Sequence, residues 1–463
     1  MPLPKPWKLP PIKVLDDNEA KNLLEQVRDS VDLKINSLDK MVDENIKKNR
    51  MSTVRLEIYD KQGNEITDAQ VEVELKNHEF KFGCNAFLAD DLGSDERNAE
   101  YERVFKDLFN QAVVPFYWKD DEPEPGKWRF EKDSPYIYRR PPAEQMLDFC
   151  KRTNCEPKGH NLVWSSNEHG VPKWLGDDKA ENGKLIDKRI RLLAERYADK
   201  IPVWDVLNEF IGANQWNYRF PDDIDVRAFK LAEELFPDDH LIINEFQCLY
   251  HPHFYLGKKS AFYLQIEKLL AAGCKVDGIG MQLHMFHNED MLATDEPLKF
   301  SAEHMVKMIN TYSTLGKDIH FSEITFPSYD GRDTYLEMQN VITENLYKLW
   351  FSMEKVKSIV WWNLVDGTAV KKANKDAAFD ENYFGGGLLK NDFSKKPAFS
   401  TLENLIKNEW HTKETIVTND KGYASFTGFN GEYDVVIKKG NDSVKRTIKV
   451  TKDNPIIVIQ LDK

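Results

Sequence analysis

Eight short apolar segments recur between residues 80 and 362, and stretches with helical periodicity separate most of them. Continuous apolar runs of this length suit strands that are buried on both faces, as in a parallel sheet. The segments lie at 80–83, 111–115, 157–163, 202–207, 241–244, 278–282, 319–322 and 359–362, with helical patterns at 188–200 and 260–272 among others. Eight strands that alternate with helices predict an α/β fold, a (β/α)8 barrel.

Two of these segments end in a glutamate. The run that contains Val203, Val206 and Leu207 stops at Asn208 and Glu209, and the run at 319–322 ends at Glu323. In an α/β barrel the carboxyl ends of the strands form the reactive face. Cleavage of a glycosidic bond needs two carboxyl groups, one to protonate the leaving oxygen and one at the anomeric carbon. The first run alone is also compatible with a surface loop that begins at Glu209, but a second glutamate at a strand end favours a functional pair.

The chain resembles glycoside hydrolase family 10, the group best known for endo-β-1,4-xylanases, and the matching motifs fall in family order over roughly residues 80–410. The motifs are Gly-His-Asn-Leu-Val-Trp at 159–164, Trp-Asp-Val-Leu-Asn-Glu at 204–209, Asp-Gly-Ile-Gly-Met-Gln-Leu-His at 277–284, Ser-Glu at 322–323, Val-Trp-Trp-Asn-Leu-Val-Asp-Gly at 360–367, Gly-Leu-Leu at 387–389 and Lys-Pro-Ala at 396–398. A single match of this kind is weak, whereas their ordered succession is specific.

The resemblance implies a retaining mechanism, in which Glu209 is the general acid/base and Glu323 is the nucleophile. In such enzymes the two carboxyl groups lie about 5 Å apart, and a glycosyl-enzyme intermediate forms. Glu209 must be protonated near neutral pH, which apolar surroundings and a neighbouring anion promote. By the same resemblance, His284 hydrogen-bonds Glu323, and Asn208 binds the sugar 2-hydroxyl; a buried amide that only ties down a loop is the alternative for Asn208.

The resemblance also assigns residues that line the sugar under attack, namely His160, Trp164, Gln282 and Trp362. A core histidine and packing tryptophans are the structural alternatives. All four lie at or just beyond predicted strand ends, where aromatic faces stack on sugars and polar groups bind hydroxyls. Asn244-Glu245 resembles an Asn-Asp pair of the family, without a defined role.

The end of the second predicted strand departs from the family. Xylanases of this family carry a Glu-Asn pair and a Lys there, which bind the neighbouring sugar on the non-reducing side. Alignment through residues 122–126 places Val113, Val114 and Tyr117 at these positions, while Trp118 is retained. We expect Tyr117 and Trp118 to contact substrate. We also expect the sugar next to the attacked one to be bound differently here than in the xylanases of the family.

Three further departures lie close to the motifs. The histidine that usually follows Trp164 is Ser165, residues 167–170 look inserted, and Ile324-Thr325 stands where Leu-Asp is usual. The resemblance therefore implies retaining hydrolysis more firmly than it implies xylan as the substrate.

The segments that flank the barrel predict one accessory domain. Two strand patterns at 54–58 and 71–75, separated by a turn at 62–64, are typical of a hairpin. Five more strand patterns follow the barrel at 415–418, 423–426, 433–438, 444–450 and 456–461. Together they predict a small β-sandwich that either binds carbohydrate or serves as a rigid spacer; residues 414–463 contain no cluster of Trp and Tyr that would favour a sugar platform.

The N-terminal 50 residues are predicted to be extended and then helical. Residues 1–16 are rich in proline, and the apolar positions of residues 17–50 follow helical spacing, with Asp16 or Asp17 as the N-cap. One or two helices packed on a later domain are expected, and a coiled coil is the alternative. The predicted organisation is an extension at 1–50, a β segment at 51–78, the catalytic barrel at 79–411 and the β-sandwich at 412–463.

Charge and cysteine content exclude several classes of protein. With 64 basic and 77 acidic residues the formal charge is −13, which argues against a nucleic-acid partner. Cys84, Cys150, Cys155, Cys248 and Cys274 are scattered, so buried free thiols are expected. The pairs His251/His253 and His284/His287 lack the further ligands of a metal site, and no metal or cofactor is expected. The acidic residues 120–122 are expected to form a solvated loop.

The sequence predicts a monomer that acts on a β-linked carbohydrate. It contains no apolar run long enough to span a membrane, and its N-terminus lacks the apolar core of a signal peptide. We therefore expect either a cytoplasmic protein or a secreted protein whose signal has been removed. The predicted activity is retaining hydrolysis, endo-1,4-β-xylanase-like, on xylan, xylo-oligosaccharides or a related plant β-glycan. The alternatives are hydrolysis of a different β-glycoside, a non-catalytic carbohydrate-binding protein, or a scaffolding protein.

Overall fold

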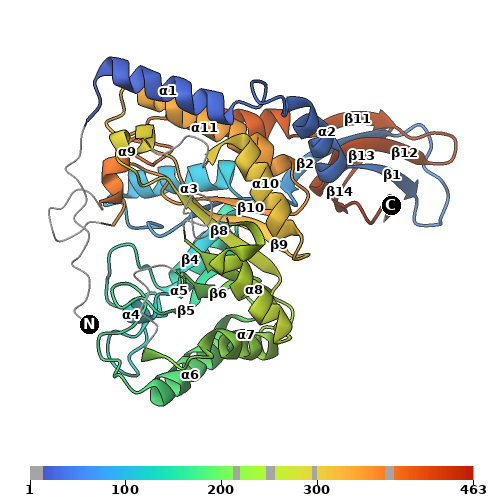
Figure 1. Ribbon diagram of the computed structural model, residues 1–463. Helices are drawn as coiled ribbons and strands as arrows, with labels where there is room; N and C mark the ends of the chain where they lie inside the picture. Colours follow the sequence, from blue (N-terminus) through green and yellow to red (C-terminus); the bar gives the residue numbers. More distant parts are fainter. Residues whose placement is uncertain (1–13, 212–218, 247–255, 295–299, 371–379, 462–463) are drawn as a thin grey trace.

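The computed structural model describes residues 14–211, 219–246, 256–294, 300–370 and 380–461 (Figure 1). Its centre is a closed barrel of eight parallel strands in the order β10-β3-β4-β5-β6-β7-β8-β9. The strands are β3 Lys81–Asn85, β4 Gln111–Pro115, β5 Glu156–Trp164, β6 Val203–Asn208, β7 His240–Glu245, β8 Gly278–His284, β9 Asp318–Thr325 and β10 Val356–Trp361. The predicted (β/α)8 barrel is confirmed, and each strand overlaps its predicted segment.

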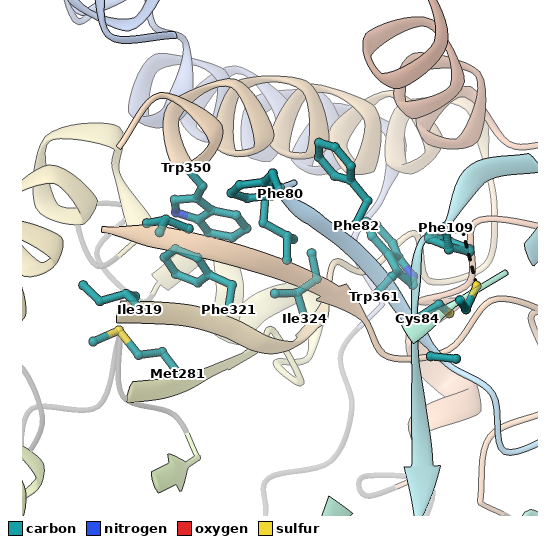
Figure 2. Close-up of a cluster of buried hydrophobic side chains, with 14 of the residues drawn as sticks. Phe80, Phe82, Cys84, Phe109, Met281, Ile319, Phe321, Ile324, Trp350 and Trp361 are labelled. Carbon is teal, nitrogen blue, oxygen red and sulfur yellow. Dashed lines mark hydrogen bonds between the residues drawn. The ribbon is translucent and has the colours of Figure 1, made fainter. Parts of the chain in front are cut away.

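Helices cover the barrel on the outside. The longer ones are α3 Asp95–Leu108, α5 Ala143–Thr153, α6 Lys179–Tyr197, α7 Ile224–Leu235, α8 Ala261–Ala271, α10 Ala302–Ser313, α11 Asp333–Ser352 and α12 Pro397–Asn404. Their apolar faces pack on the strands, as Figure 2 shows where Trp350 of α11 lies on Phe321 of β9. These two rings are stacked at 17° with centroids 3.7 Å apart. Burial of large aromatic side chains at this seam stabilises the contact between helix layer and barrel.

The N-terminal segment forms two helices, α1 Asp17–Val31 and α2 Asp39–Arg50, which pack on α11 (Figure 1). Asp16 is the N-cap of α1, and together with Glu19 it forms a capping box. Leu23, Val27 and Val31 on the apolar face of α1 are buried. The prediction of helices packed on a later domain is confirmed, and this apolar face is occupied within the chain.

The accessory β-sandwich consists of two sheets, and each contains strands from both flanks. One sheet has the order β12-β1-β15 and the other has the order β11-β2-β13-β14. The strands are β1 Met51–Tyr59, β2 Gln70–His78, β11 Lys413–Val417, β12 Tyr423–Phe429, β13 Gly431–Lys439, β14 Asp442–Val450 and β15 Ile456–Gln460. The predicted hairpin of the first two strands is wrong, because β1 and β2 lie in different sheets. Each finds its hydrogen-bonding partners among the C-terminal strands instead.

The sandwich joins the barrel at the amino-terminal ends of the barrel strands, since β2 leads directly into β3. His78 at the end of β2 packs edge-on against Phe82, Phe351 and Phe429. Buried Arg50 donates to the carbonyls of Phe351, Met353 and Val356, which closes the end of α11. The accessory domain is therefore attached at the end of the barrel opposite the carboxyl ends of the strands.

The cysteines and the character of the helices can also be compared with the sequence. Within the ranges that the structure describes, Cys84, Cys150, Cys155 and Cys274 are buried free thiols, and Cys248 lies outside those ranges. No helix in the same ranges combines the length and the apolar character needed to cross a bilayer.

Candidate active site

Glu323 lies in β9 near the carboxyl end of the barrel, held by side chains from the two preceding strands. Its Oε1 accepts hydrogen bonds from Asn244 Nδ2 at 2.8 Å and from Gln282 Nε2 at 3.0 Å. His284 Nε2 lies 3.1 Å from Oε2. Strand register explains the cluster, because Gln282 of β8 pairs directly with Glu323 of β9. Three donors therefore orient both oxygens of a buried carboxylate, an arrangement that suits an anion.

His284 is itself oriented by a hydroxyl group. Its Nδ1 lies 2.9 Å from Thr325 Oγ1, two residues beyond Glu323 on the same strand. An ionised carboxylate only accepts, so Nε2 of His284 donates to Glu323, while Nδ1 is paired with the Thr325 hydroxyl. The hydrogen bond from His284 to Glu323 expected from the sequence is present, and Thr325 is the partner behind it.

Asn244 has room for its contacts because the neighbouring strand carries a glycine. A Cβ at position 280 would lie 2.5 Å from Asn244 Oδ1. The Asn244 side chain donates to both Glu323 and Asn208 Oδ1, and it accepts from Ser322. Asn208 Oδ1 thus accepts a hydrogen bond from Asn244, which leaves the Nδ2 amino group of Asn208 available to another acceptor. Among the described residues, Asn208 Nδ2 has no hydrogen-bond partner although it is buried.

Glu209 follows β6 immediately and has an unusual backbone conformation. Its φ is 52°, in the left-handed region that non-glycine residues rarely adopt, and its amide donates to the Asn244 carbonyl at 2.9 Å. Desolvation by the surrounding protein, joined by the charges of Glu323 and Glu245, raises the pKa of the Glu209 carboxyl well above its usual value. Hydrogen bonds with Gln282 and Trp164 offset only part of this rise.

His160 is held by a buried ion pair. Its Nδ1 lies 2.8 Å from Asp205 Oδ2, and the same oxygen accepts from Lys158 Nζ at 2.9 Å. Burial alone would raise the pKa of the Asp205 carboxyl, but the Lys158 charge and the hydrogen bond with His160 hold that pKa below its usual value. The other ring nitrogen of His160 faces Glu323 Oε1 at 3.9 Å.

Aromatic rings surround His160 and form a small apolar cluster that is separate from the main core. Tyr117 meets the His160 ring edge-on at a centroid distance of 5.6 Å, and Trp362 does so at 5.7 Å. Trp362 also contacts the His284 ring at 5.8 Å, and Tyr117 contacts Trp164 at 5.5 Å. The other members of the cluster are Phe87, Val113 and Val360.

Nine of the ten side chains singled out from the sequence therefore gather at one end of the barrel. Trp118 stands apart, because its indole donates to Glu122 at 2.7 Å and packs edge-on against Trp174. The nine are Tyr117, His160, Trp164, Asn208, Glu209, Gln282, His284, Glu323 and Trp362.

The acidic segment 120–122, expected as a solvated loop, is a short buried helix, α4 Trp118–Asp121, and its end. Asp121 accepts from buried Arg189 at 3.1 Å, and burial raises the pKa of Asp121 to about 6. Glu122 is also buried and accepts from the Gly126 amide and the Trp118 indole. The expectation is wrong because these carboxylates serve as partners for buried donors, which sequence composition does not reveal.

Sequence reasoning missed Lys158, Asp205 and Arg140, and named Thr325 only as a departure from the family. For the first two a signal exists: Lys158 and His160 are two residues apart on one strand face, and Asp205 is the register partner of His160. For Arg140, whose guanidinium lies 3.8 Å from the Tyr117 ring centroid, no local pattern points to the contact.

Across the described ranges, no group of three or more His, Cys, Asp and Glu side chains is arranged to hold a metal ion. His251 and His253 lie outside those ranges.

Comparison with known proteins places these observations in a family context. The model of glycosyl hydrolase family 10 matches residues 74–404. An anti-sigma-I factor of Acetivibrio thermocellus is 25% identical over 398 residues, covering 85% of this chain and 46% of that protein. An endo-1,4-β-xylanase/feruloyl esterase of Xylanibacter ruminicola is 25% identical and covers 70% of this chain and 48% of that one. The chain thus spans about half the length of these two relatives.

Solved structures agree in fold. The crystal structure of xylanase 10B from Thermotoga maritima covers 72% of this chain and 96% of its own, with 21% identity and a TM-score of 0.55. A structure of xylanase 10B from Thermotoga petrophila, in complex with xylobiose, covers 72% with a TM-score of 0.53. At this level of identity the likeness establishes the barrel.

Proposed function

The chain belongs to glycosyl hydrolase family 10, and on that premise we propose that it is a retaining β-glycoside hydrolase. One observation carries the proposal, namely that two neighbouring carboxyl groups have opposite surroundings. Glu323 is held by three hydrogen-bond donors, whereas desolvation and nearby anions raise the pKa of Glu209. A pair of carboxyl groups whose environments differ in this way is suited to separate roles as nucleophile and acid.

In the proposed reaction, Glu323 attacks the anomeric carbon while Glu209 transfers its proton to the departing oxygen. The bond from sugar to leaving group breaks, and an ester between the sugar and Glu323 forms. Glu209, now ionised, takes a proton from water, and the resulting attack releases the sugar and restores Glu323. Atoms and charge balance over the two steps, and the net reaction is hydrolysis.

Other side chains of the site are placed to bind the sugar. Asn208 Nδ2 is a buried donor without a partner among the described residues, and we assign it to the sugar 2-hydroxyl. A hydrogen bond there strengthens as positive charge develops on the ring. Trp362 and Trp164 offer apolar ring surface, and His160, fixed by Asp205, offers a polar edge. We propose that these three side chains and Gln282 enclose the attacked sugar.

The proposed substrate is a β-linked plant glycan or oligosaccharide, with xylan and xylo-oligosaccharides as the first candidates. Support comes from relatives named endo-1,4-β-xylanases, among them one of Thermotoga neapolitana that is 23% identical and covered over 84% of its length. The apolar residues at the end of β4 favour, as the second candidate, a β-glycoside other than xylan.

The first experiment is product release from a panel of xylan, xylo-oligosaccharides, aryl xylosides, aryl glucosides, mixed-linkage glucan and cellulose. We expect turnover of at least one member by the wild type and none by Glu323→Ala, which should still bind ligand. Failure of the wild type to turn over any β-glycoside would refute the proposed activity. It would favour the alternative of a non-catalytic carbohydrate-binding protein.

The roles of the two glutamates are separated by the choice of leaving group. A dinitrophenyl leaving group departs without protonation, so Glu209→Ala should retain formation of the glycosyl-enzyme with that substrate. With a sugar leaving group the same variant should lose about 10²–10⁴-fold in rate, the usual contribution of a general acid. Glu323→Ala should be inactive on both. Equal losses on both substrates for Glu209→Ala would contradict the assignment.

The pH profile tests the surroundings of Glu209. Because the pKa of this carboxyl is raised, the protonated acid persists to higher pH than for an ordinary glutamate. The rate should fall as pH rises through that pKa, and this limb should be absent from Glu209→Ala with the dinitrophenyl substrate.

A further inference from the structure

We infer that the site accepts a single sugar on the glycone side, so that the protein removes one sugar at a time from the non-reducing end of its substrate. This inference rests on the proposed function and specifies the class of substrate, namely chains or aryl glycosides attacked at their terminal residue. It is carried by a closed aromatic wall at the place that a second glycone sugar would need.

The direction of the substrate follows from the positions of the two glutamates. The general acid must lie beside the leaving oxygen, so the aglycone extends on the side of Glu209, which follows β6. In the strand order of the closed barrel, β10 stands opposite β6, with β3 beside it. A glycone longer than one sugar would therefore extend over the carboxyl ends of β10, β3 and β4.

That side is filled by the apolar cluster around His160, whose rings form the aromatic wall. Trp362 follows β10, Phe87 follows β3, and Tyr117 follows β4. The Phe87 ring lies 5.4 Å from Trp362 and 5.9 Å from Tyr117 between centroids, both edge-on. Phe87 is 1% exposed, Tyr117 4% and Trp362 7%. Trp362 is assigned to the sugar under attack, and Phe87 and Tyr117, the two most deeply buried of these rings, leave no open surface on which a second sugar could stack.

Charged groups pack against the wall and hold it in place. The Arg140 guanidinium lies over the Tyr117 ring, 3.8 Å from its centroid, so that face of Tyr117 is covered. Arg140 is in turn fixed by a 3.0 Å hydrogen bond from Nε to Asp120 Oδ2, within a largely buried ion pair. Swinging Tyr117 aside would break a cation–π contact in a desolvated setting.

The inserted segment 167–170 reinforces the same wall. His169 stacks on the Trp164 ring at 22° with centroids 5.6 Å apart, while Tyr117 contacts Trp164 as well. Lys119 donates to the Glu168 carbonyl and so ties the insertion to α4. Two departures from the family, at the end of β4 and after Trp164, therefore both add rings to the wall that covers the glycone side.

The leaving-group side differs in exposure. Phe210 and Ile211, which follow Glu209, are partly exposed, in contrast to the wall. Of the described residues around the two carboxylates, those beyond β6 thus reach solvent while those beyond β3, β4 and β10 are covered. Within the described ranges, a site that is covered on the glycone side and partly exposed after β6 fits the end of a chain.

The test is the first product released from xylo- and cello-oligosaccharides of four to six sugars that carry a fluorescent label at the reducing end. We expect free monosaccharide and a labelled product shorter by one sugar. Unlabelled fragments of two or more sugars in the initial phase would overturn the inference and leave the proposed hydrolase intact. Absence of turnover of these oligosaccharides and of aryl glycosides would overturn both.

Variants then test which side chains close the pocket. Tyr117→Ala should raise the ratio of disaccharide to monosaccharide released by about tenfold or more, since small changes in pocket volume discriminate substrates on this scale. Arg140→Ala leaves the Tyr117 ring in place and should also raise the ratio of disaccharide to monosaccharide. This variant tests the inference if Tyr117→Ala does not fold. Tyr136→Ala, at a residue that is 71% exposed, is the matched control. Unchanged product ratios in both wall variants would refute the assignment.

Discussion

Replacing Lys158 with methionine should destabilise the barrel strongly, because the buried Asp205 carboxylate would keep one partner instead of two. Lys158 Nζ lies 2.9 Å from Asp205 Oδ2, and the two side chains are 3% and 0% exposed. At that separation two unit charges attract by about 6 kcal/mol for an effective dielectric constant of about 20. Removing one partner of a buried pair typically lowers the free energy of unfolding by about 3–5 kcal/mol.

A matched pair that is more accessible to solvent provides the control. Lys81 and Glu156 are 2.8 Å apart on strands of the same barrel, with side chains 25% and 27% exposed. Lys81→Met removes the same chemical group, yet solvent replaces the lost partner, so the loss should stay below about 1 kcal/mol. The double variant Lys158→Met/Asp205→Asn should recover part of the loss, because no unpaired charge then remains buried.

Urea unfolding followed by tryptophan fluorescence measures these differences, with kcat/KM recorded on each variant. The reasoning would be refuted if Lys158→Met lost no more stability than Lys81→Met. It would also be refuted if the double variant were less stable than Lys158→Met alone, since the loss would then not arise from an uncompensated carboxylate.

Three further predictions concern the site and the junction. Gly280→Ala should lower kcat/KM at least tenfold because its Cβ would lie 2.5 Å from Asn244 Oδ1, whereas Gly176→Ala, whose Cβ meets open space, should match the wild type. Thr325→Val should cost about 1–3 kcal/mol in urea unfolding and lower kcat, because His284 Nδ1 loses its hydroxyl partner; Thr325→Ser should restore both. Burial lowers the pKa of His78 to about 3, below its unfolded value of about 6.5, so stability should be full above pH 6.5 and fall as pH drops towards 3; this slope should be smaller in His78→Phe.

Several elements were predictable because their signals are local. The strand that ends at Asn208 is an apolar β-branched run, and its structural bounds differ from the predicted ones by one residue at each end. The sandwich strands follow period two, and they form as expected. The hairpin of β1 and β2 failed because pairing partners far along the chain, in β12 and β13, competed successfully for the same edges. Strand pattern specifies that a strand exists, whereas pairing is a property of the whole sheet.

The sequence by itself determined the barrel, the family and the two glutamates at strand ends, since periodicity and ordered motifs are readable along the chain. Only the tertiary structure decided what surrounds them. The raised pKa of Glu209 depends first on desolvation by the surrounding protein, and then on the charges of Glu323, 114 residues away, and of Glu245. The covering of Tyr117 by Arg140, and of Trp164 by His169, joins segments whose sequences carry no sign of contact. Desolvation and ring packing arise from side chains brought together in space, so the shape of the pocket emerges only when the chain is folded.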